Sequence, residues 1–181
     1  MRLRPTDIPD VLVVEPVVHE DARGFFMETW HRDKFRAAGL DRTFAQDNHT
    51  GSVRNTLRGL HYQLGRPQGK LVRVVAGEIF DVAVDLRRSS PTFGRWAGIT
   101  LSAGNRCQLW VPEGFAHGYY VVSERAEVLY KCTDVYVPEE EHTLRWDDPD
   151  VAVAWPIGVE PPLVSPKDTK GHSLRSAPAF P

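Results

Sequence analysis

Residues Lys70 to Asp85 have the sequence KLVRVVAGEIFDVAVD, two runs of valine-rich apolar residues separated by Ala76-Gly77. β-Branched residues favour extended strands, and a glycine between two such runs is typical of a tight turn. The stretch therefore predicts two consecutive strands, Lys70–Ala76 and Ile79–Leu86. Similar short runs predict further strands at Val11–Val14, Gln108–Val111, Tyr119–Val122 and Val128–Tyr136.

Helical patterning is nearly absent from the chain. Only His31–Ala38, followed by Gly39, has the spacing of a helix, and a further turn is expected near Lys167-Asp168. Many short strands with few helices predict an all-β sandwich or barrel, in which closure removes exposed strand edges. A length of 181 residues predicts a single domain, residues 1–181.

Charge and composition argue against several classes of protein. The chain has 22 basic and 24 acidic residues, whereas a nucleic-acid-binding protein needs clustered cations. No apolar run approaches the ~18 residues of a membrane span, and the N-terminus lacks the apolar stretch of a signal peptide. Cys107 and Cys132 are too few for a disulfide framework. We therefore expect a cytoplasmic protein with no nucleic acid and no membrane as partner.

Polar residues occur in three stretches where a scaffold would not need them, the third being Pro112–Gly118 with His117. The first is Gln46-Asp47-Asn48, followed by Leu57–Gln63. If the second segment is a strand, period-two counting places Gly59 and His61 on one face and Arg58 on the other. A histidine in such a run has a structural interpretation as well as a functional one.

The predicted strand Ile79–Leu86 also carries charge. Asp81 and Asp85 share one face, opposite the apolar residues Phe80, Val82, Val84 and Leu86. If the apolar face forms the core of a sandwich, both carboxylates are solvated. In a barrel with a polar cavity, Asp81 instead points toward a ligand.

Composition changes from Pro156 onward, where six prolines occur before the C-terminus and apolar patterning fades. We expect the last dozen residues to form a loosely draped tail. The stretch Ser165–Asp168 is treated differently, because the resemblance described below gives it a role. The segment of about residues 156–181 is thus expected to fold back in part on a site.

The residues Pro112, Gly114 and His117 fit the second half-motif of the cupin superfamily, whose fold is a jelly roll. In metal-binding cupins the first half-motif supplies a His-x-His pair and a glutamate seven residues before a glycine. Here His61 has no such partner, and Lys70 stands seven residues before Gly77. Because a cationic side chain repels a divalent cation, we expect no metal site and no cofactor.

Within this superfamily the chain resembles the dTDP-4-dehydrorhamnose 3,5-epimerase family, from about Val11 to Asp168. Nine short motifs in the same order carry the resemblance: RGFFME (23–28), QDN (46–48), LRGLH (57–61), QGKL (68–71), FDV (80–82), SPTFG (90–94), WVPEGFAHG (110–118), LYK (129–131) and RWDDP (145–149). Any one of them is weak, but together they are specific. The resemblance implies a cupin-type jelly roll that acts on a dTDP-linked 4-keto-6-deoxyhexose.

The resemblance also implies a mechanism, because a ketone at C4 acidifies the hydrogens at C3 and C5. It makes His61 the base, paired with Asp168, and Tyr130 the proton donor on the opposite face of the sugar. A histidine suits the task because its ordinary pKa lies near the working pH. Lys70 is the candidate that stabilises the enolate oxygen. On pattern alone, Tyr130 is typical of a core aromatic and Lys70 of an exposed lysine at a strand end.

Further positions match residues that bind substrate in the family. Arg23 and Arg58 suit a diphosphate, and Tyr136 matches an aromatic that stacks on thymine. Asp81 is assigned to the cavity by strand geometry. The remaining predicted binding residues are Glu28, Gln46, Asp47, Asn48, Lys70, His117, Glu141 and Lys167.

Several alternatives stay open on sequence alone. Arg58 and His61 are three residues apart, so either Gly59 marks a bulge or Arg58 serves another part of the site, across the interface of the homodimer typical of the family. The chain could invert only C3 or only C5. It could also be a sugar-nucleotide-binding cupin without activity, or a metal-dependent cupin oxygenase, which Lys70 disfavours.

Overall fold

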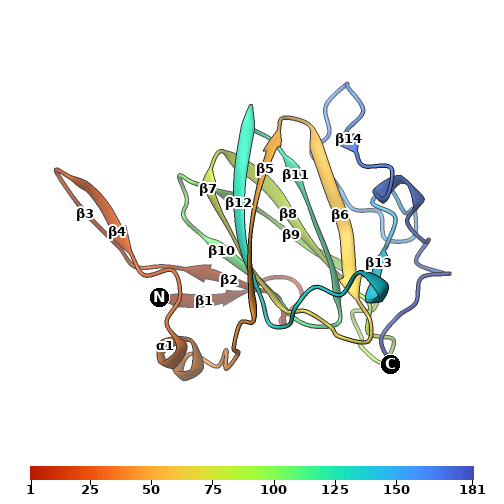
Figure 1. Cartoon of the computed structure of the whole chain (residues 1–181), viewed down its shortest axis with the longest axis horizontal. Coiled ribbons are helices and arrows are strands. Elements are labelled where there is room, and N and C mark those ends of the chain that lie inside the picture. The colour runs from red at the N-terminus through yellow and green to blue at the C-terminus, as the bar shows by residue number, and fades with distance from the viewer.

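The computed structural model describes residues 1–181 and consists of two large β-sheets that face each other, with a short hairpin beside them (Figure 1). The first sheet has the strand order β1-β2-β10-β7-β12-β5, and the second β13-β6-β11-β8-β9, with β14 parallel to β6. The strands are β1 (Arg2–Pro5), β2 (Leu12–Glu15), β3 (Val18–Asp21), β4 (Gly24–Met27), β5 (Gln46–Val53), β6 (Thr56–Gln63), β7 (Lys70–Ala76), β8 (Glu78–Asp85), β9 (Trp96–Ser102), β10 (Gln108–Val111), β11 (Phe115–Val121), β12 (Arg125–Cys132), β13 (Glu141–Thr143) and β14 (Leu163–Val164). The helical elements are α1 (Arg32–Ala37) and the 3₁₀ turns η1 (Pro138–Glu140) and η2 (Asp168–Lys170).

The stretch from Lys70 to Asp85 forms β7 and β8, as its pattern predicts, and connects the two sheets. Gly77 has φ +74°, and a Cβ there would lie 2.0 Å from the carbonyl oxygen of Arg125. Only glycine fits this crossing, because it tolerates positive φ and needs no side-chain space. The turn thus carries the chain from one wall of the barrel to the other.

Apolar side chains from both sheets fill much of the space between them, including Val13, Val72, Ile79, Leu101 and Phe115. A second apolar cluster lies on the outer face of the β6-β11-β8 sheet, where Leu60, Val82 and Val84 pack against Trp155 and Phe180 of the C-terminal segment. The middle strands of this sheet are therefore covered on both faces.

Because both faces of this sheet are covered, one alternative from the sequence is wrong, namely that Asp81 and Asp85 are solvated. Both side chains are fully buried. Asp85 accepts hydrogen bonds from the side chains of Arg87, Ser90 and Thr92, which hold its pKa at about 2 against the opposing effect of burial. Both faces of β8 are largely covered, so the alternation of polar and apolar residues does not separate core from surface here.

Most predicted elements occur within a few residues of their expected bounds, with one exception. The strand expected over Val128–Tyr136 ends at Cys132, because the chain turns away at Thr133 toward η1. The polar strand β5 pairs with β12 along its whole length. The single α-helix has six residues, and the chain contains no helix with the length and apolar character to cross a bilayer.

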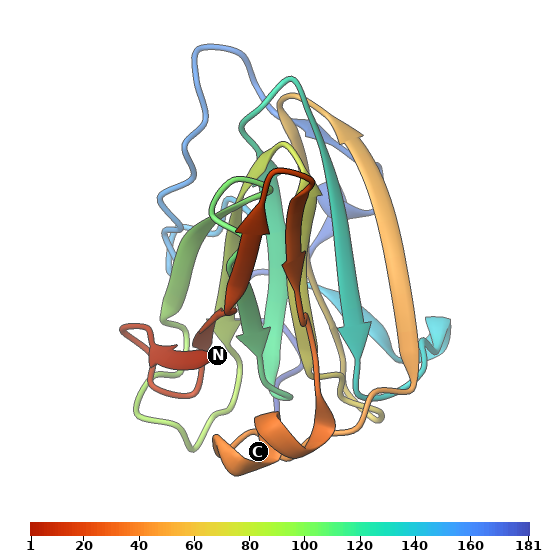
Figure 2. The same ribbon diagram turned by 90° about the vertical axis from the view of Figure 1, so that its left-hand side faces the viewer.

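The β3–β4 hairpin projects from one side of the barrel, and the C-terminal segment covers the opposite side (Figures 1 and 2). Phe25 and Phe26 on β4 are 57% and 71% exposed. Large exposed aromatics on a projecting element are unusual for a surface that contacts only water. The C-terminal segment, in contrast, packs closely on β6 and β8, where Ala177 is buried. The prediction that the last dozen residues form a loosely draped tail is therefore wrong, because their apolar side chains cover the outer face of the sheet.

Candidate active site

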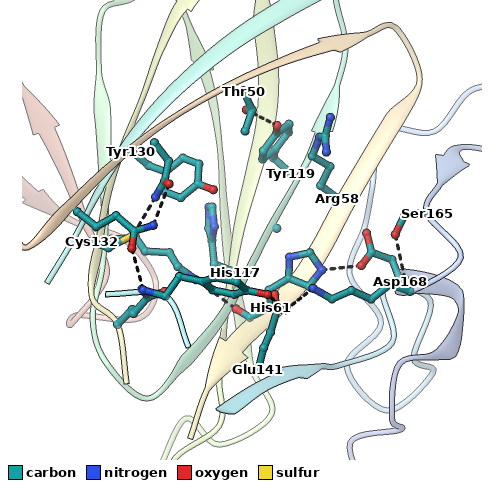
Figure 3. A pocket seen from close by; sticks show the side chains of 17 residues that line it. Thr50, Arg58, His61, His117, Tyr119, Tyr130, Cys132, Glu141, Ser165 and Asp168 are labelled. Atoms are coloured by element: carbon teal, nitrogen blue, oxygen red, sulfur yellow. Dashed lines mark hydrogen bonds and ion pairs between the residues drawn. The ribbon is translucent and has the colours of Figure 1, made fainter. Parts of the chain in front are cut away.

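A cavity of about 410 Å³ opens between the two sheets (Figure 3). Strands β5, β7 and β12 of the first sheet and β6 and β11 of the second contribute to its walls, together with the C-terminal segment. Its lining is mostly polar. Of the residues predicted from the sequence, it contains Gln46, Asn48, Arg58, His61, Lys70, His117, Tyr130, Tyr136, Glu141, Lys167 and Asp168.

Arg58 and His61 line the same cavity, although they are three positions apart on β6. His117 of β11 is opposite His61 and Tyr119 is opposite Arg58, so β6 carries one residue more than β11 over this interval. The irregularity centres on Gly59, which has φ +120° and whose Cβ would lie 2.6 Å from the Cα of Gly118. A bulge at Gly59 therefore re-aims the strand, and the first of the two sequence alternatives holds.

His61 forms a tight pair with Asp168, which reaches it from the C-terminal segment. The His61 Nε2 to Asp168 Oδ1 distance is 2.5 Å, and Asp168 Oδ2 accepts the N–H of Gly59 at 3.3 Å. Burial alone would raise the pKa of Asp168, which is 3% exposed, but hydrogen bonds from His61, Gly59 and Ser165 lower it below its usual range. The carboxylate thus stays ionised beside the imidazole and fixes its orientation.

Tyr130 and His61 extend from opposite sheets, on opposite sides of the cavity (Figure 3). Burial raises the pKa of Tyr130 to about 12, so the phenol is protonated at neutral pH. Lys70 is almost fully buried in the cavity wall, and its Nζ donates to the carbonyl oxygen of His61 at 3.3 Å. Burial lowers the pKa of Lys70, while the charges of Glu141 and Asp81 partly oppose this.

His117 also has a carboxylate partner, Asp81, at 2.7 Å between Nε2 and Oδ1. Asp81 has no exposed surface and does not line the cavity. The prediction that Asp81 binds substrate directly is therefore wrong, because His117 stands between its carboxylate and the open space. Asp81 instead orients His117.

Three predicted binding residues form a linked group at the cavity. The Tyr136 hydroxyl donates to Glu141 Oε2 at 2.6 Å, and the same oxygen forms an ion pair with Lys167. This hydrogen bond, together with burial, raises the pKa of Tyr136 to about 12. Burial would raise the pKa of Glu141, but its bonds to Lys167 and Tyr136 lower it. The ring of Tyr136 and the ammonium group of Lys167 are thus linked through Glu141. This arrangement suits a nucleotide, whose base can stack on the ring and whose phosphate can pair with the cation.

On β5 the side chains alternate between the cavity and the outer surface. Gln46 and Asn48 line the cavity, where Gln46 Nε2 donates to Asn48 Oδ1 at 2.9 Å. Asp47 lies on the other face and forms an ion pair with Lys131 at 2.9 Å. The prediction that Asp47 binds substrate through its side chain is wrong for this chain's cavity, because strand alternation points it outward.

Arg23 and Glu28 also lie outside this chain's cavity, at the projecting hairpin and just beyond it. The side chain of Arg23 is 90% exposed and pairs with Asp21, whereas Glu28 pairs with Lys34. Neither residue lines the cavity of its own subunit, because the hairpin extends away from the barrel that holds His61, and their role in substrate binding stays a prediction.

The cavity also contains residues that the sequence analysis did not single out. Tyr119 is buried and its hydroxyl is 2.8 Å from Thr50 Oγ1, beside Arg58. Gln68, Gly118, Cys132 and Ser165 complete this set. Ser165 precedes Asp168 by three residues in a pattern typical of helix caps, a signal that could have marked it.

The donor set of this cavity suits an anionic, hydroxyl-bearing ligand. Arg58, Lys70 and Lys167 supply cations, and both histidines already direct one ring nitrogen to a carboxylate. No group of three or more His, Cys, Asp or Glu side chains is arranged to hold a metal ion. The residues present therefore match a sugar nucleotide better than a metal cofactor.

Comparison with known proteins agrees with this chemistry. The family model described as dTDP-4-dehydrorhamnose 3,5-epimerase matches residues 5–176. The chain belongs to this family. It is 53% identical over 175 residues to a dTDP-4-dehydrorhamnose 3,5-epimerase from Pseudomonas aeruginosa, covering 96% of each protein. It is 56% identical over 177 residues to one from Neisseria gonorrhoeae, covering 98% of this chain but 54% of that longer protein.

A solved structure shows the same fold. The dTDP-6-deoxy-D-glucose-3,5-epimerase from Legionella pneumophila, in complex with dTDP-4-keto-L-rhamnose, superposes with a TM-score of 0.94. Its sequence is 46% identical, and the match covers 97% of this chain and 93% of that protein. The all-β, cupin-type jelly roll predicted from the sequence is thereby confirmed, and the chain is an isomerase of the epimerase class.

Proposed function

We propose that the protein inverts C3 and C5 of dTDP-4-dehydro-6-deoxy-D-glucose and so forms dTDP-4-dehydro-L-rhamnose. The observation that carries this proposal is the placement of a His61–Asp168 pair and a protonated Tyr130 on opposite sides of one polar cavity. Inversion of a carbon next to a ketone needs a base on one face of the ring and an acid on the other.

In the first step His61 removes the proton at C3 or C5 with the ring nitrogen that is not bonded to Asp168. The electrons of the broken C–H bond form a C=C bond to C4. The π electrons of the C4 carbonyl move onto its oxygen, so that the ketone becomes an enolate. Asp168 stabilises the imidazolium that forms, since its carboxylate stays ionised and lies 2.5 Å from the ring. Lys70, buried in the wall, supplies the cation that stabilises the enolate oxygen.

In the second step Tyr130 returns a proton to the same carbon from the other face, which inverts it. A phenol with a pKa of about 12 is a weak acid, but an enolate is a strong enough base to accept its proton. His61 then releases its proton to solvent and the Tyr130 phenolate takes one up from solvent, after which the same pair of groups serves the second of the two centres, C3 or C5. The nucleotide is held separately, with Arg58 and Lys167 on the diphosphate and Tyr136 against the thymine ring.

We further propose a homodimer in which the β3–β4 hairpin of one protomer reaches the cavity of its partner. Arg23 is too far out on the hairpin to line its own cavity, and the neighbouring Phe25 and Phe26 are exposed. Contact with a second copy would bury these aromatics and bring Arg23 to a diphosphate.

Proton NMR of dTDP-4-keto-6-deoxyglucose in deuterated water, with protein stripped of metals by a chelator, tests the activity. Deuterium incorporation at both C3 and C5 is expected. Exchange at one centre would make the chain a mono-epimerase. Binding without exchange at either centre would make it a sugar-nucleotide-binding cupin. Exchange that returns only when metal is added would contradict the absence of a metal site.

Mixing two inactive variants tests the exchanged hairpin. In a heterodimer of His61→Ala and Arg23→Ala protomers, one cavity has both an intact base and an intact hairpin if the hairpin crosses to the partner. Mixing should then restore up to about half of the activity per heterodimer. If Arg23 acts within its own protomer, mixing restores nothing.

A further inference from the structure

The catalytic carboxylate does not belong to the barrel, so its position depends on how the C-terminal segment is attached. Just before Asp168, β14 pairs in parallel with β6, with Val164 opposite Leu57. Four residues later Asp168 returns to the same strand and contacts Gly59 and His61. The intervening turn therefore sets the direction in which the carboxylate points.

Ser165 occupies the first position of that turn. Its Oγ accepts the backbone N–H of Asp168 at 3.2 Å, and its carbonyl oxygen accepts the N–H of Thr169 at 3.1 Å. Pro166 follows at a position where no N–H donor is needed, so the proline fits the turn and does not displace Asp168. These contacts resemble those of a helix N-cap, although η2 itself begins at Asp168 and Lys167, at its own N-cap position, forms no side-chain capping bond.

The segment Ser165-Pro166-Lys167-Asp168 also matches a capping box, in which the acidic residue three places after the serine bonds back to the cap. Only half of that arrangement is present. The backbone of Asp168 bonds to Ser165, whereas its carboxylate turns to His61 and to the N–H of Gly59. A local capping motif thus holds the backbone while the side chain is left for the imidazole.

We propose that Ser165 is a positioning residue that aims the Asp168 carboxylate at His61. The proposal rests on the roles given above to His61 and Asp168. Ser165 lies at the open edge of the cavity and packs no apolar core, and the hydrogen bond that its side chain forms within the protein is the one to the Asp168 backbone. Ser165 also contributes, with His61 and Gly59, to keeping the carboxylate ionised.

Steady-state kinetics of Ser165→Ala, Ser165→Thr and Thr169→Ala test this role. Ser165→Ala should lower kcat about fivefold to tenfold with KM unchanged, the size expected for one lost capping bond. Ser165→Thr keeps the hydroxyl and should restore kcat. Thr169→Ala removes a hydroxyl that bonds the carbonyl of Pro166 in the same turn, and should match the wild type. A rise in KM at constant kcat would show that Ser165 serves Lys167, and would overturn the proposal.

A double substitution distinguishes this inference from the proposed function. If Ser165 acts through Asp168, Ser165→Ala should have no further effect on kcat in an Asp168→Asn background. An independent, additive loss would overturn the positioning role. Full activity of Asp168→Asn and His61→Ala would instead overturn the proposed function. Loss of activity in those two, with Ser165→Ala equal to the wild type, would overturn this inference alone.

Discussion

Two neighbouring histidines line the cavity, and each is paired with a carboxylate, but the two pairs differ in construction. His61 and His117 lie directly opposite each other on β6 and β11. The partner of His117, Asp81, comes from the adjacent strand β8, and sheet register alone holds this pair together. The partner of His61, Asp168, comes from a segment that wraps the barrel from outside.

The two carboxylates also differ in how fully they are bonded. Both oxygens of Asp168 accept hydrogen bonds, whereas Oδ2 of Asp81 is buried without a partner. A carboxylate with several donors supports a positive charge that forms beside it during a reaction. We therefore assign proton transfer to the His61 pair and sugar binding to the His117 pair.

Alanine substitution of the two histidines tests most directly whether the two pairs have different roles. His61→Ala should lower kcat by about 10³- to 10⁴-fold, because the general base is lost. His117→Ala should act mainly on KM, raising it about tenfold through one lost bond to the sugar. Deuterium exchange and initial rates measure both. Equal losses of kcat in the two variants would show that the pairs share the chemistry.

The two carboxylates should also differ in how much they contribute to the free energy of unfolding. Here the larger contribution is expected from Asp81, the partner of His117. Asp81→Ala should reduce the free energy of unfolding by about 3–5 kcal/mol, because it leaves His117 without its partner deep in the barrel. Asp168→Ala should cost about 1–3 kcal/mol, since the C-terminal segment can shift and admit water. Urea unfolding followed by tryptophan fluorescence gives both values. A larger loss for Asp168→Ala would mean that the C-terminal segment is integral to the barrel.

The sequence predicts some of these features better than others. Strands β7 and β8 follow from their valine-rich pattern, and the identity of His61, Tyr130 and Lys70 follows from the family resemblance. Strand β5 gives no such signal. One of its faces lines a polar cavity and the other is exposed, so no apolar alternation develops along Gln46–Val53.

Other features depend on backbone geometry that no local pattern reports. Period-two counting puts Arg58 and His61 on opposite faces, and only the bulge at Gly59 brings them together. The burial of Asp81 depends on the cover over both faces of β8. The position of Arg23 depends on the direction in which the hairpin leaves the barrel. Each of these is a property of the tertiary arrangement.

The pH dependence of the unfolding free energy tests how much the ionised Asp168 carboxylate stabilises the fold. The pKa of Asp168 is lowered in the folded protein from the ordinary value of 3.8. Its ionised form therefore stabilises the fold above that pH, and this contribution is lost as the pH falls through the lowered pKa. The difference in unfolding free energy between wild type and Asp168→Asn should be constant above about pH 5 and shrink below about pH 4. A difference that grows on acidification would show that the folded protein binds the proton more tightly.

The smallest expected effect concerns the attachment of the C-terminal segment itself. The Tyr62 hydroxyl, on the outer face of β6, donates to the carbonyl oxygen of Pro178 at 2.6 Å. Tyr62→Phe should cost about 1 kcal/mol and increase hydrogen exchange in the C-terminal segment, because one buried bond is lost. Ser89→Ala, which removes an exposed 3.2 Å bond to Pro181, is the matched control and should change neither quantity. Of the two pairs, only the His61 pair depends on this segment, so Tyr62→Phe should reduce kcat slightly. A rise in KM alone would show that the segment acts through Lys167 and not through Asp168.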